Sequence, residues 1–102
     1  MKKIIKPRGK GKTTELIKLS AETNTYILVA NKMRQIAVAE LARSMNIDIP
    51  YPVTVEDYMR THFRGSFIKN ILIDDADAVL QSIFNTVVID AITITEPESE
   101  EV

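Results

Sequence analysis

Short apolar runs alternate along this chain with stretches in which apolar residues recur at helical spacing. A run of consecutive apolar residues is typical of a buried strand, and a spacing of three and four is typical of an amphipathic helix. Pro7, Asn24 and Gly65 mark turns between such segments. The predicted strands are 2–6, 26–30, 52–54, 68–75 and one that begins at 86–89 and can continue to 95, and the predicted helices are 13–24, 32–46, 55–63 and 76–84.

Each predicted helix has an apolar face that should pack against the strands. Asn31 is expected to cap the second helix, and Thr54 with Asp57 approximates a capping box at the start of the third. In the first strand, Ile4 and Ile5 are the expected buried residues. The expected inward residues are Leu16, Ile17 and Leu19 in the first helix, Met33, Ile36, Ala37, Leu41 and Met45 in the second, Val55, Tyr58 and Met59 in the third, and Val79, Leu80, Ile83 and Phe84 in the fourth.

The alternation of strand and helix from one end to the other predicts an α/β fold. In this class a mostly parallel sheet lies between layers of helices, so we expect a three-layer sandwich with a ligand at the carboxyl ends of the strands. The continuous run at 26–30 suits a strand buried on both faces of such a sheet. Residues 1–95 are expected to form one domain, and the acidic residues 96–102 a disordered tail.

The residues 6–14 (KPRGKGKTT) join the first predicted strand to the first predicted helix in the manner of a phosphate-binding loop. Glycines let successive backbone N–H groups curl round an anion at a helix N-terminus, where the helix dipole also favours negative charge. Lys12 would reach the β and γ phosphates, and Thr13 would offer its hydroxyl to Mg²⁺. A basic, glycine-containing turn that meets a helix by chance is the alternative. The predicted nucleotide-binding residues are Arg8, Gly9, Lys10, Gly11, Lys12, Thr13 and Thr14.

Two carboxylates, Asp74 and Asp75, close the apolar run 71–73. A buried parallel strand brings its carboxyl end to the same sheet edge as the loop. Asp74 is therefore predicted to hold Mg²⁺ through water, and Asp75 to orient or deprotonate an attacking water. The alternative is structural, because either carboxylate can cap the helix that begins near Ala76.

Together these motifs resemble the ATPase core of helicases and phage terminases, which is a RecA-like P-loop NTPase of the additional-strand type. Residues 9–13 (GKGKT) keep the Gly-x-Gly-Lys-Thr pattern, and residues 74–77 (DDAD) are similar to the Asp-Glu-Ala-Asp box. Two positions differ: Lys6 stands where the full loop has its first glycine, and Asp75 stands where the family has the longer glutamate. The resemblance implies bound ATP and Mg²⁺, with Arg8, which precedes the first glycine as in terminases, as the cation beside the γ-phosphate.

Three further features bear on the same resemblance. Residues 91–95 (AITIT) look like the motif beside the γ-phosphate in helicases, and equally like any half-exposed strand. Arg60 and Arg64 are either cations donated to a neighbouring site or solvated surface arginines. His62 is the only histidine, which excludes a multi-histidine metal site.

Composition and charge narrow the class further. The chain has 102 residues, of which 45% are hydrophobic and none is cysteine, so disulfides and thiolate metal sites are excluded. No apolar run approaches membrane-spanning length, and we expect a cytoplasmic protein, in the host cytoplasm if phage-encoded. The net charge of −1 combines a basic N-terminus with an acidic C-terminus. DNA is thus a candidate partner, although lysines that flank a phosphate site explain the same charge.

We therefore expect a P-loop ATPase domain that binds ATP with Mg²⁺ and hydrolyses ATP when assembled with itself or with a partner protein that completes the site, in phage-type DNA metabolism. The first alternative is a nucleotide-binding switch or adaptor with negligible hydrolysis, which the shorter acid at Asp75 favours. The second is a nucleic-acid-binding module whose basic loop holds backbone phosphates.

Overall fold

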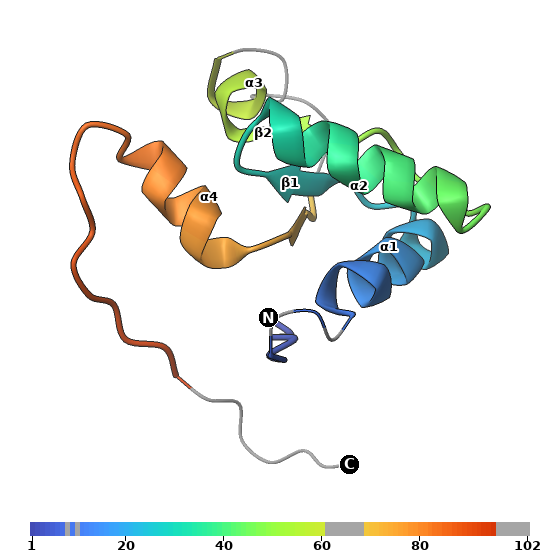
Figure 1. Ribbon diagram of the computed structural model, residues 1–102, viewed down its shortest axis with the longest axis horizontal. Coiled ribbons are helices and arrows are strands. Elements are labelled where there is room, and N and C mark those ends of the chain that lie inside the picture. Colours follow the sequence, from blue (N-terminus) through green and yellow to red (C-terminus); the bar gives the residue numbers. More distant parts are fainter. Residues whose placement is uncertain (8, 10, 61–68, 96–102) are drawn as a thin grey trace.

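The computed structural model describes residues 1–7, 9, 11–60 and 69–95. Within these residues the chain forms helices and strands in the predicted alternating order (Figure 1), which confirms the α/β fold. The end of the third predicted helix and the predicted tail 96–102 lie outside the described residues. The elements are α1 (Lys12–Thr23), β1 (Ile27–Val29), α2 (Lys32–Ser44), β2 (Val53–Thr54), α3 (Val55–Arg60), β3 (Leu72–Ile73) and α4 (Ala76–Ile83).

The three strands form one parallel sheet in the order β2-β1-β3. β1 is the central strand, with Leu28 opposite Val53 on one side and Ile73 on the other. As predicted for the run at 26–30, every residue of β1 is buried. Because the strands are parallel, their carboxyl ends lie at one edge of the sheet, where α2, α3 and α4 begin.

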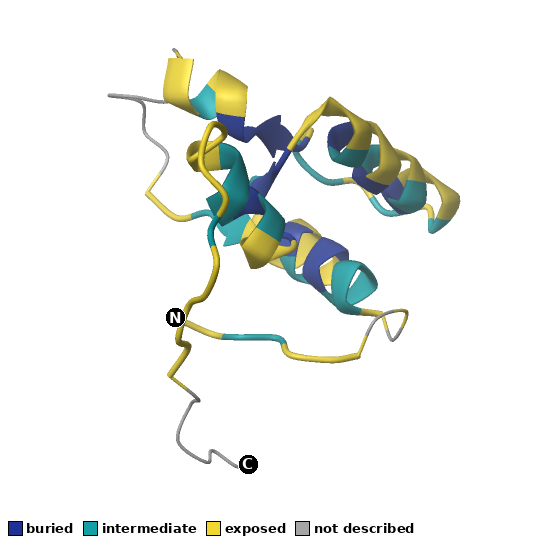
Figure 2. Cartoon of the chain, turned by 60° about the vertical axis from the view of Figure 1, so that its left-hand side comes forward, coloured by how far each residue is buried: buried dark blue, intermediate teal, exposed yellow. Residues whose placement is uncertain are grey.

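Helices cover both faces of this sheet. Successive residues of a strand point to opposite faces. Ile27 and Val29 pack with residues of α1 and α2, whereas Leu28 and Ala30 pack with residues of α3 and α4. Figure 2 shows the buried residues gathered at the sheet and on the sides of the helices that face it. The described residues thus form three layers, with one pair of helices on each side of the strands.

Polar residues define the helix ends as the sequence predicts. The Asn31 side chain accepts a hydrogen bond from the backbone N–H of Arg34 at 2.9 Å, which caps α2. The Thr54 hydroxyl accepts one from the N–H of Asp57 at 3.0 Å, which caps α3. Asn24 ends α1 with φ 54°, a left-handed conformation that asparagine tolerates better than most residues.

The helix α2 packs through a different face from the predicted one. Met33 is 77% exposed, and Ile36 and Ala37 are exposed as well, so the prediction that these three residues face inward was wrong. A polar residue replaces them, because the Gln35 amide donates a buried hydrogen bond of 2.8 Å to the carbonyl of Pro52. This bond makes an amide side chain acceptable in the interior. The buried residues of α2 are Gln35, Val38 and Ala42, with Leu41 and Met45 partly buried against the same core.

The other predicted inward faces are only partly correct. Leu16, Ile17, Val55 and Val79 are buried as predicted, and Ile4 packs against the core while partly buried. Four predicted inward residues are instead exposed: three lie in the last turn or at the C-cap of a helix, beyond the short strands of the sheet, and one lies in the irregular segment 1–7. They are Ile5 (67% exposed), Met59 (55%), Phe84 (52%) and Ile83 (44%).

The first and last predicted strands are absent from the described residues. Residues 1–7 and 88–95 adopt no regular secondary structure. The predicted strand 2–6 contains three lysines and only two apolar residues, so it has little surface to bury in a sheet. The strand β3, at the edge of the sheet, has only two residues and offers few backbone groups to a further strand.

A side-chain network replaces the last predicted strand immediately after α4. The Gln81 amide donates to the carbonyl oxygens of Phe84 at 3.1 Å and Val87 at 2.6 Å. Its oxygen accepts from the N–H of Ile89 at 2.9 Å. Local bonds of this kind compete with strand pairing, because they satisfy backbone groups that a sheet would otherwise use.

Candidate functional site

The loop before α1 depends on the conformations of two glycines. Gly9 and Gly11 have φ of +77° and +86°, values that L side chains rarely adopt. An added Cβ would meet no atom within 4 Å at either position, so backbone conformation, not space, requires glycine there. Gly11 is also the N-cap of α1 and provides no side-chain cap. The first N–H groups of α1 thus receive no cap from the N-cap residue, and N–H groups at such a position are suited to bind an anion.

The Lys12 side chain folds back across this loop. Its ammonium donates hydrogen bonds to the carbonyl oxygens of Lys6 at 3.0 Å and Pro7 at 3.3 Å. These bonds join the first residue of α1 to the residues at the start of the loop. Because an ammonium has three N–H donors, a phosphate within the loop can receive the third.

The Lys6 side chain points to another partner, Glu15, in the first turn of α1. Its ammonium lies 2.8 Å from the Glu15 carboxylate. The hydrogen bond and charge of Lys6 together hold the pKa of Glu15 below its ordinary value, with smaller contributions from Lys2 and Lys18. The pair links the start of the loop to the helix that follows it.

Asp74 lies at the carboxyl end of β3 and is only 6% exposed. Its backbone N–H donates to the carbonyl of Leu28 at 3.1 Å, which attaches it to the central strand. Its side-chain oxygen Oδ1 accepts a hydrogen bond of 3.0 Å from the Thr13 hydroxyl. The structure therefore joins the residue that follows Lys12 to the first of the two predicted acids.

Arg34 is a further residue of this site, which the sequence did not identify. Its guanidinium donates a hydrogen bond of 2.7 Å to the second carboxylate oxygen, Oδ2, of Asp74. Arg34 stands in the first turn of α2, positioned by the Asn31 cap. Two sequence signals together could have pointed to Arg34. They are the predicted cap at the start of its helix and the predicted position of Asp74 at the carboxyl end of a neighbouring strand.

Asp75 is exposed and adopts the left-handed conformation, with φ 60° and ψ 72°. It occupies the N-cap position of α4, but its side chain makes no capping hydrogen bond. Asp75 thus stands at the start of α4, as the structural alternative expects, but its carboxylate does not cap the helix. Aspartate is among the few non-glycine residues that enter this region, and the carboxylate points to solvent instead of capping the helix.

The remaining candidate residues are less closely placed. Thr14 is partly buried in the first turn of α1. Arg60 is exposed and pairs with Glu56 at 2.7 Å on the same helix. Residues 91–95 are exposed and irregular. Arg8, Lys10, His62 and Arg64 lie outside the described residues.

A hollow in the described structure lies away from the loop. It has a volume of about 360 Å³ and lies between α4 and the segment that follows it, where its lining includes Asp77, Gln81 and Ile92. None of the loop residues, Thr13 or Asp74 contributes to it. We give the loop more weight because its charged and hydroxyl groups converge, whereas this hollow is an open gap beneath a segment without regular structure.

The donor groups at the loop suit Mg²⁺. This ion usually keeps several waters and takes only one or two oxygens from protein side chains. The Thr13 hydroxyl and the Asp74 carboxylate are held side by side by their 3.0 Å hydrogen bond. In the described residues no three His, Cys, Asp or Glu side chains gather to form a protein-only metal cage. One carboxylate and one hydroxyl, completed by phosphates and waters, form the kind of site that Mg²⁺ takes in nucleotide-binding proteins.

Comparisons of the chain with protein-family models, with curated proteins and with solved structures gave no significant match. None of the helices in the described ranges has both the length and the apolar character needed to cross a membrane. The interpretation of the site therefore rests on its own geometry.

Proposed function

We propose that this chain is an ATP- and Mg²⁺-binding P-loop domain with a minimal RecA-like core, of the kind that the helicase and terminase resemblance implies. The observation that carries the proposal is the 3.0 Å hydrogen bond between the Thr13 hydroxyl and the Asp74 carboxylate, which are 61 positions apart in sequence. A chance basic turn has no reason to end beside a nearly buried carboxylate at the carboxyl edge of a parallel sheet.

Each residue of the proposed site has a distinct task. The backbone N–H groups from Gly9 to Thr13 would surround the β-phosphate, and the Lys12 ammonium would bind the β- and γ-phosphate oxygens. Thr13 and Asp74 would hold Mg²⁺, which neutralises developing charge on the phosphates when bound. Asp75 is exposed at the same edge, where it would orient the attacking water.

Hydrolysis would also need a cation beside the γ-phosphate, and Arg8 is the proposed one, with an arginine from a second copy or partner as the other source. This requirement supports an ATPase that turns over when assembled with itself or a partner in cytoplasmic, phage-type DNA metabolism. The second candidate, a nucleotide-dependent switch, is favoured by the exposed, short carboxylate of Asp75. An offset of about 1 Å in such a group can lower a rate roughly a hundredfold.

The decisive test is calorimetric binding of Mg·ATP to the wild-type chain and to Lys12→Ala. Loss of a charge-assisted hydrogen bond costs about 1.5–3 kcal/mol, so affinity should fall roughly 10- to 150-fold. Lys18→Ala is the matched control, because Lys18 is exposed on the same helix and its removal changes the net charge equally. Equal binding by all three proteins would refute the loop as a nucleotide site.

Turnover then separates the two candidate functions. ATP hydrolysis that requires Lys12, measured with and without DNA and over a range of protein concentrations, supports the enzyme. Asp75→Asn is the informative variant, since asparagine tolerates the left-handed conformation while removing the charge. Tight binding without turnover supports the switch, and DNA binding that is sensitive to salt and indifferent to ATP supports the nucleic-acid-binding alternative.

A further inference from the structure

Asp74 is shared between two donors. Its Oδ1 accepts from Thr13 at 3.0 Å, and its Oδ2 accepts from Arg34 at 2.7 Å. The two charged partners differ in exposure, because the Asp74 side chain is 6% exposed and that of Arg34 is 40% exposed. The carboxylate is thus nearly buried within the fold, whereas the Arg34 side chain is partly exposed although its Nε is buried.

The hydrogen bonds of Arg34 are incomplete in this arrangement. Arginine can bind a carboxylate through two parallel N–H···O bonds. Here the terminal nitrogen makes the bond to Asp74, while Nε is buried and finds no acceptor among the described residues. A buried donor without an acceptor is unfavourable, so a state that supplies another acceptor would stabilise this side chain.

We infer that Arg34 is an exchangeable cation of the site, which neutralises Asp74 in the nucleotide-free protein and moves to the phosphates when Mg·ATP binds. This inference rests on the proposed function and adds a residue that the loop and carboxylate motifs do not contain. Arg34 would act on the metal only indirectly, by neutralising Asp74, and would bind the phosphates directly.

The electrostatics follow from the position of the guanidinium. The positive guanidinium beside Oδ2 weakens the attraction between Asp74 and a divalent cation, so the free metal should bind poorly. Phosphate oxygens that enter the loop offer Arg34 stronger, bidentate acceptors. Departure of the guanidinium then restores the full charge of Asp74 to the metal. Metal and nucleotide would therefore bind together rather than separately.

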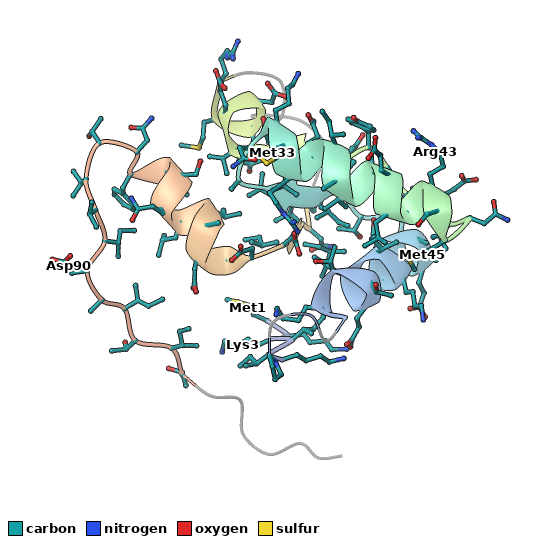
Figure 3. All side chains as sticks on the ribbon, viewed as in Figure 1. Met1, Lys3, Met33, Arg43, Met45 and Asp90 are labelled. Carbon is teal, nitrogen blue, oxygen red and sulfur yellow. The ribbon has the colours of Figure 1, made fainter. Side chains whose placement is uncertain are left out.

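The test uses two titrations of the full chain. In the first, Mn²⁺ alone is titrated against protein and its binding is followed by electron paramagnetic resonance. In the second, Mg·ATP binding is followed by calorimetry. The variants are Arg34→Gln, which removes the charge, Arg34→Lys, which keeps it, and Arg43→Gln as the matched control. Met33, which precedes Arg34, and Arg43 mark opposite ends of α2 (Figure 3).

The expected signature is a pair of opposite effects. Arg34→Gln should bind Mn²⁺ alone on the order of five- to tenfold more tightly and bind Mg·ATP more weakly by a similar factor. Arg34→Lys should keep the weak Mn²⁺ binding of the wild type, and Arg43→Gln should behave as wild type in both titrations. A general folding defect would weaken both forms of binding, so it cannot produce this pattern.

The contrary outcomes are distinguishable. If the wild type binds Mg·ATP through Lys12, but Arg34→Gln shifts both affinities in one direction or neither, the role of Arg34 is overturned and the proposed function stands. If the wild type does not bind Mg·ATP, both the proposed function and the inference that rests on it are overturned.

Discussion

The Glu15 carboxylate links the start of the loop before α1 to that helix in a way that depends on pH. Lys6 lies 2.8 Å away, and its hydrogen bond and charge lower the pKa of Glu15 in the folded protein. A lowered pKa means that the ionised carboxylate favours the folded state. This contribution is complete above the unfolded-state pKa of about 4.3 and is lost as pH falls through the lower folded-state pKa.

Glu15→Gln should therefore lower the free energy of unfolding slightly at pH 7, and the difference from wild type should vanish in acid. The effect is small because both side chains are about 40% exposed, and added salt should reduce it further. Urea unfolding from pH 7 down to below the folded-state pKa measures the difference. Glu40→Gln, at an exposed position of α2, is the control. A difference that persists unchanged in acid would contradict the ion-pair explanation.

Sequence patterns predicted the residues of the loop and the carboxylate as parts of this site, but not the contact of the carboxylate with Arg34. Lys12, Thr13 and Asp74 carry their chemistry in recognisable local patterns, a glycine-containing loop and an apolar run that closes on acids. Arg34 belongs to no such pattern. Its contact with Asp74 arises because the Asn31 cap marks where α2 begins and because parallel pairing brings β3 beside β1, a spatial register that local sequence patterns do not reveal.

Substitutions at one buried and one exposed position of α2 can test which face of this helix packs against the core. Gln35→Leu keeps a similar volume but leaves the buried carbonyl of Pro52 without its donor. The expected cost is about 1–3 kcal/mol. Met33→Gln, at a position that is 77% exposed on the same helix, should change stability by less than about 0.5 kcal/mol.

Urea unfolding of the two variants and the wild type measures both effects. The two substitutions have opposite expectations under the two orientations of the helix. If Met33 faced the core, its replacement would be the damaging change and that of Gln35 would be mild. The larger loss at Met33 would therefore contradict the observed packing of α2.

Hydrophobic spacing alone cannot resolve this orientation. Met33, Ile36, Ala37, Leu41 and Met45 form a continuous apolar stripe, yet only its last two members are partly buried. The Gln35 amide is buried in place of the first members of this stripe. Its partner is a carbonyl 17 residues away in sequence, so local spacing does not reveal the bond. The caps at Asn31 and Thr54 were predictable because their donors lie within three residues. Hydrogen bonds between residues that are close in sequence can be predicted from it, whereas those between distant residues cannot.

Across the described residues, the predicted alternation of strand and helix is correct from α1 to α4, whereas the first and last predicted strands do not form. Residues 26–30 are apolar throughout and become the buried strand β1, whose two faces define the helix layers. The end segments contain the same strand-like residues but no partner strand in the described structure. Val88, Ile92 and Ile94 are exposed, while Lys3 reaches the carbonyl of Thr95 at 2.8 Å.

Nucleotide binding should therefore stabilise the entire fold rather than the loop alone. The proposed site takes Lys12 and Thr13 from α1, Arg34 from α2 and Asp74 from the end of β3, so a ligand there connects three elements that are distant in sequence. At a hundredfold excess over its dissociation constant, a ligand that binds only the folded state adds about 2.7 kcal/mol. In a domain of this size the melting temperature should rise by roughly 10–20 °C.

Thermal unfolding with and without Mg·ATP measures this rise in wild type, Lys12→Ala and Thr13→Ala. Each variant must first be saturated to the same extent, using the dissociation constant from calorimetry, because linkage depends on the ratio of ligand to that constant. At one fixed ATP concentration the wild type should gain most, since its affinity is highest. If saturated wild-type protein showed no rise, the ligand would bind folded and unfolded chains equally. A nucleotide site assembled from three separate elements cannot do so, because unfolding separates Thr13, Arg34 and Asp74.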